Sequence, residues 1–144
     1  MNDSALPVID LSLLDGGPES AAQFRDDLLR ATHDVGFFYL VGHGVDETLM
    51  DDLLAASREF FALSEEQKFA VENVKSPQFR GYTRVGGELT EGKTDWREQI
   101  DVGPERPVVD NAAGLADYWR LEGPNQWPDA VPQLRDLVNE WNDK

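Results

Sequence analysis

The sequence predicts an α+β fold, and two observations carry this prediction. In the first half of the chain, short apolar runs bounded by turn residues alternate with segments whose apolar residues recur every three or four positions. The first pattern is typical of strands and the second of amphipathic helices. From residue 77 to residue 107 the sequence changes to short, polar, glycine-interrupted stretches, in which only brief strands are expected.

The first strand and helix are predicted near the start of the chain. Residues 6–11, LPVIDL, form a strand pattern with Pro7 at its beginning, where a missing N–H is tolerated. Ser20 is the expected N-cap of the first helix, because Gln23 follows three residues later and completes a capping box. Gly36 is expected to end this helix.

A second strand and two further helices follow. Residues 37–41, FFYLV, are apolar without alternation, so the sequence predicts a strand covered on both faces. Asp46 is the expected N-cap of the next helix, and Ser64 with Gln67 repeats the capping-box spacing for a short third helix. Further along, Ile100 suggests a brief strand, and a last amphipathic helix is expected to begin near residue 130.

Charge and composition exclude several classes of function. The 144 residues include 13 Lys and Arg against 28 Asp and Glu, a net charge of −15. Such a surface repels phosphate backbones and anionic lipids, so neither nucleic acid nor a membrane is expected as a partner. Cysteine is absent, which excludes disulfides and thiolate metal sites. Because the sequence has neither a secretion-signal pattern nor an apolar run of about 20 residues, a cytoplasmic protein is expected.

Residues 87–94, GELTEGKT, match the phosphate-loop pattern G-x-x-x-x-G-K-[ST]. A working phosphate loop joins a buried strand to a helix whose N-terminus faces the phosphates. Here the preceding segment is polar, and Gly103 and Pro104 leave no room for a long helix. Glu88 would also place a carboxylate beside polyphosphate. A surface loop is therefore the favoured interpretation, and a nucleotide binder using Gly87 to Thr94 remains a remote alternative.

No catalytic centre can be placed from the residues alone. His33 and His43 are the two histidines, and neither has a histidine partner two or four positions away, so a metal site at either is not expected. Large aromatic residues in the second half could either line a small-molecule pocket or anchor loops to a core. These are Tyr82, Trp96, Tyr118, Trp119 and Trp127.

Several segments, taken in order, resemble the N-terminal region of the isopenicillin N synthase-like family of non-haem Fe(II) oxygenases. They are LPVIDLSLL, GFFYLVGHGV, FFALSEEQK, RGYTRVGGE, DWREQIDVGPE and GPNQWP. The resemblance implies that residues 1–144 are a single partial domain. They would form the N-terminal helical and short-strand region of a double-stranded β-helix, or jelly-roll, oxygenase from which most of the barrel is missing.

The resemblance also implies Fe(II) and 2-oxoglutarate as cofactors of the parent protein. In the family, an H-x-D pair with a distant histidine holds the iron and an Arg-x-Ser pair grips 2-oxoglutarate, all downstream of the region seen here. This chain contains no H-x-D. No metal ligand or catalytic residue is therefore expected in the chain, and the segment alone is expected to bind neither cofactor and to be inactive.

Five residues are candidates for the substrate pocket by resemblance. Arg80, Tyr82 and Glu88 fall in the region that approaches the substrate side of the pocket in the family. Asn125 and Trp127 belong to the family's N-x-W-P element, which leads into the last helix. His43 corresponds to a structural turn histidine.

The leading hypothesis is the N-terminal part of an Fe(II)/2-oxoglutarate-dependent oxygenase that oxidises a small molecule and is completed by a C-terminal barrel in the same polypeptide. The alternative is a truncated or standalone interaction module without catalytic activity. That alternative predicts a contiguous exposed apolar patch larger than monomers usually show.

Overall fold

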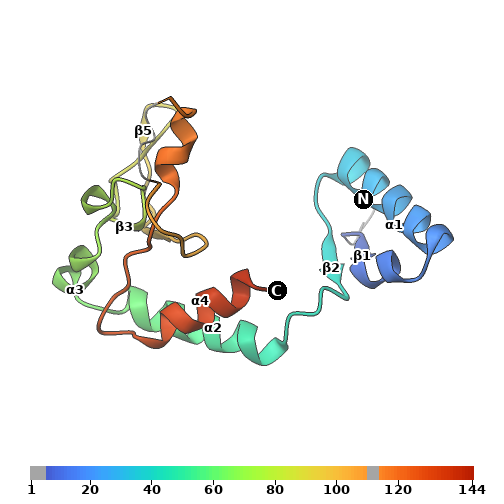
Figure 1. Ribbon diagram of the computed structural model, residues 1–144, viewed down its shortest axis with the longest axis horizontal. Helices are drawn as coiled ribbons and strands as arrows, with labels where there is room; N and C mark the ends of the chain where they lie inside the picture. The colour runs from blue at the N-terminus through green and yellow to red at the C-terminus, as the bar shows by residue number, and fades with distance from the viewer. Residues whose placement is uncertain (1–5, 110–113) are drawn as a thin grey trace, which may run out of the picture. The chain divides into compact units, whose positions relative to one another are not determined.

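The computed structural model describes residues 6–109 and 114–144, and it divides into two compact units, Met1–Gly44 and Val45–Lys144. In the first unit, strand β1 (Val8–Asp10) leads through a 3-10 turn into helix α1 (Pro18–Arg30), and strand β2 (Tyr39–Val41) follows (Figure 1). The two strands pair in parallel, with Ile9 opposite Leu40. Helix α1 closes the small core of this unit through Phe24.

The start of α1 differs from the prediction. Ser20 is not the N-cap; it lies in the first turn of a helix that begins at Pro18. The fixed φ of proline suits the first helical position, and the preceding Gly17 takes φ 95°, which glycine adopts freely. Gly36 ends the helical segment as predicted, with φ 86° and its N–H donating to the Ala31 carbonyl.

The predicted burial of residues 37–41 is wrong for the part of the chain that the structure describes. The strand is confirmed over β2, but Phe37 is 72% exposed and Tyr39 is 62% exposed. Within the first unit, β1 occupies one edge of β2, and the core of Ile9, Phe24 and Ala31 does not include a β2 side chain. Phe38 packs against this core, and the rest of the apolar run lies at the surface of the unit.

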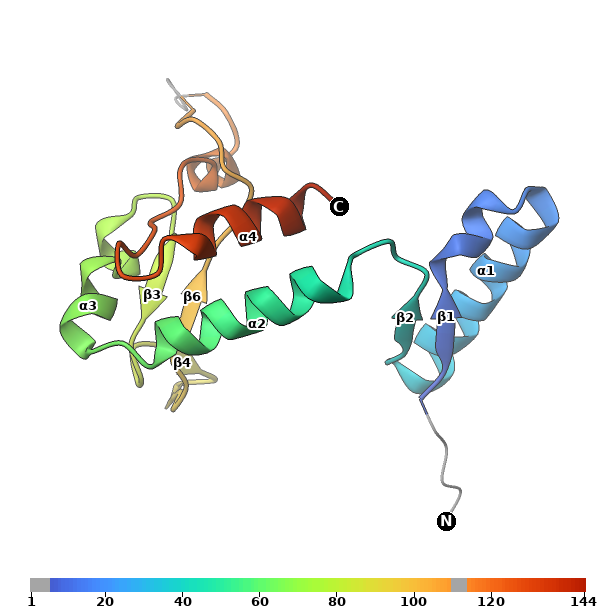
Figure 2. The same cartoon turned by 90° about the horizontal axis from the view of Figure 1, so that it is seen from below.

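The second unit begins with helix α2 (Glu47–Phe61) and the short helix α3 (Glu65–Ala70). Strand β3 (Gly81–Thr83) pairs antiparallel with β6 (Gln99–Asp101), and Tyr82 lies opposite Ile100. Between them, β4 (Leu89–Thr90) and β5 (Lys93–Thr94) form a separate hairpin. Helix α4 (Gln133–Asn142) packs alongside α2 (Figure 2).

Local signals placed most of these elements correctly. Asp46 caps α2 by accepting from the Thr48 N–H at 2.7 Å, and Ser64 and Gln67 form the complete capping box of α3. The strand near Ile100 is confirmed as β6. The last helix begins at Gln133 rather than near residue 130, because residues 129–132 form a turn that buries Val131.

The core of the second unit lies between the helices and β3. Phe60 and Val131 are its most deeply buried side chains, and Tyr82 from β3 packs edge-on against Phe60 at 6.0 Å between ring centroids. This core therefore fixes β3 against α2 and α4. The α+β class is confirmed, and the described strands form three short pairs without a closed barrel. Among residues 6–109 and 114–144, none of the helices combines the length and apolar character needed to cross a bilayer.

Candidate functional site

Residues 87–94 lie mostly at the surface, as the favoured interpretation expects, and the remote phosphate-loop alternative is wrong. These residues form the β4–β5 hairpin, whose turn residues Glu91 and Gly92 both have positive φ, 51° and 77°. Two such residues in a two-residue loop match the twist of a hairpin. The residues after Thr94 lead into β6 rather than into a helix, so Lys93 lies in an exposed strand that does not open onto a helix N-terminus.

A hollow of about 500 Å³ lies beside this hairpin. It combines apolar side chains, two carboxylates and one guanidinium from the segment before β3, from β3 and from the hairpin. The lining residues are Glu72, Asn73, Val74, Phe79, Thr83, Arg84, Gly87 and Glu88. Of the five sequence candidates, Glu88 lines this hollow and the other four do not.

The two carboxylates of the hollow differ in how they are paired. Arg84 donates to Glu72 from both Nε, at 2.7 Å, and Nη2, and its guanidinium lies over the Phe69 ring. Glu72 is thus neutralised by a fixed cation. Glu88 accepts from the Gln99 amide at 3.2 Å, and its other oxygen lies 3.5 Å from the Arg97 guanidinium.

Tyr82 lies in the core rather than at a pocket surface. Its hydroxyl donates to Glu98 Oε2 at 2.6 Å, and Lys68 Nζ donates to the same oxygen at 2.7 Å. Lys68 Nζ also donates to the Phe61 carbonyl and lies 5.3 Å from the Tyr82 ring centroid. Glu98 therefore ties the segment between the hairpin and β6 to α3 and β3.

This network shifts two pKa values in opposite directions. The hydrogen bond from Lys68, followed by the one from Tyr82, holds the pKa of Glu98 below its usual value. Burial, followed by the hydrogen bond to Glu98, raises the pKa of Tyr82 well above its usual value. Tyr82 therefore remains a neutral donor and Glu98 a charged acceptor at neutral pH.

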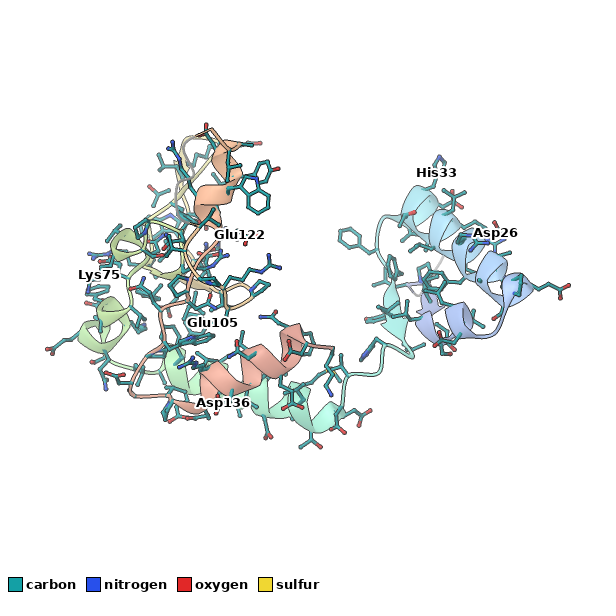
Figure 3. The ribbon with its side chains drawn as sticks, viewed as in Figure 1. Asp26, His33, Lys75, Glu105, Glu122 and Asp136 are labelled. Atoms are coloured by element: carbon teal, nitrogen blue, oxygen red, sulfur yellow. The ribbon has the colours of Figure 1, made fainter. Side chains whose placement is uncertain are left out.

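Asn125 and Trp127 converge on the chain that follows β6. Asn125 accepts from the Gly103 N–H at 2.9 Å and donates to the Gly103 carbonyl at 2.7 Å, as a paired strand would. Its amide also donates to Glu105 at 2.8 Å, and the Trp127 indole N–H donates to the same Glu105 oxygen at 3.1 Å. Glu105 is labelled in Figure 3. Gln126, which lies between Asn125 and Trp127 in the sequence, donates to the carbonyls of Glu72 and Arg80.

Arg80 lies against the same segment. Its Nη2 donates to the Leu121 carbonyl at 3.1 Å, and its guanidinium packs so closely on Gly103 that a Cβ there would lie 2.7 Å from Nη2. Arg80 Nε is buried without a hydrogen-bond partner. The structure thus brings Arg80, Asn125 and Trp127 together around Gly103 and Glu105, apart from the hollow that Glu88 lines.

Sequence reasoning missed Lys68, Glu98 and Gln126. Glu98 is one of five acidic residues between positions 88 and 101 of the sequence, and its partner Lys68 is 30 residues away on a helix. Gln126 lies inside the N-x-W-P element, so this element is the sequence feature that could have pointed to it. Among the aromatic residues with two possible roles, Tyr82 and Trp127 anchor to the core, whereas Trp96 is 81% exposed.

Metal donors are dispersed in the described part of the chain. Residues 6–109 and 114–144 contain no group of three or more His, Asp or Glu side chains positioned to hold a metal ion. His33 projects outward from the end of its helix (Figure 3), and its Nδ1 lies 2.8 Å from the carboxylate of the adjacent Asp34. The exposed His33–Asp34 pair therefore gives at most two donors, fewer than the three protein ligands that a catalytic metal site commonly has.

Residues 6–130 match the family described as non-haem dioxygenase in morphine synthesis, N-terminal. The chain belongs to this family. The predicted resemblance to the N-terminal region of non-haem oxygenases is therefore confirmed. The match covers both compact units and the elements from β1 to the turn before α4.

Relatives of this dioxygenase family are similar over nearly the whole chain. The 2-oxoglutarate-dependent dioxygenase frbJ of Dothideomycetidae sp. (strain 11243) is 38% identical over 98% of this chain and 37% of its own length. Homoarginine-6-hydroxylase 2-ODD-C23.1 of Arabidopsis thaliana is 35% identical over 95% of this chain and 43% of its own length. The chain thus spans about two fifths of the length of the curated relatives it matches.

A solved structure has the same fold. A full-length Neurospora crassa protein, determined in complex with alpha-KG and thymine, superposes with a TM-score of 0.68 at 24% identity. The superposition covers 99% of this chain and 45% of the Neurospora crassa chain. The fold of this dioxygenase N-terminal region is therefore the one seen in a larger protein.

Proposed function

We propose that this chain is the N-terminal part of a cytoplasmic Fe(II)/2-oxoglutarate-dependent oxygenase that oxidises a small molecule. The observation that carries the proposal is the family match over residues 6–130. The relatives named 2-oxoglutarate-dependent dioxygenase and homoarginine-6-hydroxylase support it, because each extends well beyond the region shared with this chain. The charge of −15 supports a partner other than nucleic acid.

The described residues do not fit an iron site, because they lack a converging set of three metal donors. The proposal therefore assigns Fe(II) and 2-oxoglutarate to a C-terminal barrel of the same polypeptide. In that arrangement, the segment described here is inactive alone. Its contribution is to hold one wall of the substrate side in place.

The five candidate residues divide into two roles under this proposal. Glu88 is the one that would contact the substrate, since its carboxylate lines the hollow beside the hairpin. The other four would act as positioning residues: Tyr82 through Glu98, and Arg80, Asn125 and Trp127 through the segment after β6.

An interaction module without catalytic activity is the second candidate function. The exposed apolar surface at Phe37 and β2 favours it, because such a surface is usually covered by another part of a protein or by a partner. The same surface suits the oxygenase proposal if the C-terminal barrel covers it. The two functions therefore differ in whether a catalytic part accompanies this chain.

Formation of succinate from 2-oxoglutarate tests the proposal. The polypeptide that carries this chain together with its C-terminal continuation should form succinate when Fe(II) and O₂ are supplied, and chelation of iron should abolish the reaction. Residues 1–144 alone should form none. Absence of iron-dependent succinate from the longer polypeptide, across a panel of small-molecule substrates, would reject the oxygenase and favour the interaction module.

A further inference from the structure

The hollow beside the β4–β5 hairpin has features that the oxygenase proposal does not specify. We infer that it binds a small molecule that carries a cationic amine, amidine or guanidinium on a short apolar stem, with Glu88 as the counter-ion. Only one part of the inference rests on the proposed function, namely that the bound molecule is the substrate of the oxygenase. The binding itself depends on residues that the chain supplies.

The volume of the hollow suits a small ligand. About 500 Å³ falls within the usual range for small-molecule sites. The lining comes from three segments that are tied to one another. Tyr82 holds β3 in the core, Asn73 donates to Thr83 Oγ1 at 2.9 Å, and the Gly87 N–H donates to the Arg84 carbonyl at 2.8 Å. The walls are therefore set by the fold and do not depend on the ligand for their position.

One wall is apolar and open. Val74 is 80% exposed and Phe79 is 50% exposed, so both present carbon surface to whatever enters the hollow. Phe79 holds this position with φ 58°, a conformation that bulky residues rarely adopt. Aromatic and branched apolar surfaces of this kind bind the methylene stem of a ligand and also attract a cation over the ring face.

The charges of the lining favour a cation over an anion. Arg84 is paired with Glu72 and lies over the Phe69 ring, so the two formal charges of this pair offset each other. Glu88 carries the remaining formal charge. Its neighbour Arg97 lies closer to Asp95, at 3.0 Å, than to Glu88, at 3.5 Å, and its side chain is mostly exposed. Because exposed ion pairs of this geometry are weak, a ligand cation can replace Arg97 at Glu88.

Binding of n-butylguanidinium to the 144-residue chain tests the inference. The titration is followed by amide chemical shifts in two-dimensional NMR, without iron or 2-oxoglutarate. The expected result is saturable binding with shifts concentrated at Gly87, Glu88 and the segment 72–74. The neutral isostere n-butylurea should bind about tenfold more weakly, because it cannot form the charge-assisted hydrogen bond.

Two variants and a matched control locate the site. Glu88→Gln should weaken n-butylguanidinium binding about tenfold and leave n-butylurea unchanged. Glu91→Gln removes the same charge from the hairpin turn, outside the hollow, and should leave both affinities unchanged. Phe79→Gly removes the apolar wall at a position where glycine relieves strain, so it should weaken both ligands without unfolding the chain.

Equal affinity for the cation and the urea, or an unchanged affinity in Glu88→Gln, overturns the inference. Failure of the oxygenase proposal gives a different result. Cation binding at Glu88 in a polypeptide that never forms succinate would retain the site and reject the oxygenase. Succinate formation without cation binding would reject the cation site and retain the oxygenase.

Discussion

Replacing Glu98 by Gln tests whether the buried network with Lys68 and Tyr82 holds β6 and the hairpin to the core. Glutamine keeps the shape and can still accept from the Tyr82 hydroxyl, but it removes the charge opposite Lys68. The Lys68 side chain is only 10% exposed and that of Glu98 is 28% exposed. The substitution therefore leaves a nearly buried ammonium without a counter-charge, with only neutral oxygens, such as the Phe61 carbonyl, as acceptors.

The magnitude follows from this intermediate burial. Exposed ion pairs contribute about 0–1 kcal/mol, whereas breaking a fully buried pair costs about 3–5 kcal/mol. The Lys68–Glu98 pair lies between these limits, so Glu98→Gln should lower the free energy of unfolding by about 2 kcal/mol. Adding Lys68→Met should recover part of the loss, because replacing both partners removes the unpaired charge.

Urea denaturation followed by tryptophan fluorescence measures this change in the relevant part of the chain. All four tryptophans, Trp96, Trp119, Trp127 and Trp141, lie in the second compact unit. Glu91→Gln, at the exposed hairpin turn, is the matched control and should change the midpoint little. A Glu98→Gln variant within about 0.5 kcal/mol of the parent, or a double variant less stable than Glu98→Gln, would refute the reasoning.

The loss of stability caused by Glu98→Gln should become smaller as the pH falls. The pKa of Glu98 is lowered in the folded state, so its stabilisation is fully present above the ordinary carboxylate pKa of about 4.3. It is lost as the pH falls through the lowered folded-state value, when Glu98 takes up a proton. The difference in stability between the parent and Glu98→Gln should therefore be constant near neutral pH and shrink in acid. A difference that grows on acidification would contradict the assigned shift.

Substitutions at Asn125, at Gly81 with Gly92 as its comparison, and at Ser64 test other contacts of the fold by the same denaturation assay. Asn125→Ala should lower the free energy of unfolding by about 2–3 kcal/mol, because the Gly103 N–H, the Gly103 carbonyl and the Glu105 carboxylate lose the Asn125 amide as a partner. An unchanged stability would show that Asn125 is not needed to hold the segment after β6. Gly81→Ala should lower the free energy of unfolding by about 3 kcal/mol, because Gly81 has φ 114° and an added Cβ would collide with the Val71 carbonyl. Gly92→Ala should cost only about 1 kcal/mol, because Gly92 has φ 77° but open space around it. Equal losses in the two variants would exclude the collision. Ser64→Ala should cost about 1 kcal/mol by removing the N-cap of α3, and Ser64→Asp should retain most of the stability.

The local parts of the fold could be predicted because their signals lie within a few residues. The capping box of Ser64 and Gln67 and the glycine at position 36 are read directly from the sequence. Competition between local signals caused the error at Ser20, where Pro18 and Gly17 set an earlier start. The phosphate-loop pattern is a chance match, since Glu91 and Gly92 take the positive φ values of a hairpin turn.

The parts that could not be predicted depend on pairings between distant residues. Lys68 and Glu98 are 30 residues apart, and no local pattern distinguishes Glu98 from the other acids of its loop. The exposure of β2 has a different cause. An apolar run such as FFYLV shows that a surface favours burial, but not which part of a protein covers it. The resemblance named the five candidate site residues, whose roles stay a prediction, and the contacts that each of them makes required the structure.

The mass of the protein isolated from its native source tests the central claim most directly. Under the proposed function, these 144 residues are the N-terminal part of a longer oxygenase, because the relatives are more than twice as long as the region they share with this chain. Intact mass spectrometry should therefore find a polypeptide well above 16.2 kDa whose continuation supplies the iron ligands. A native species of 16.2 kDa would contradict the account and leave the interaction module as the function of the chain.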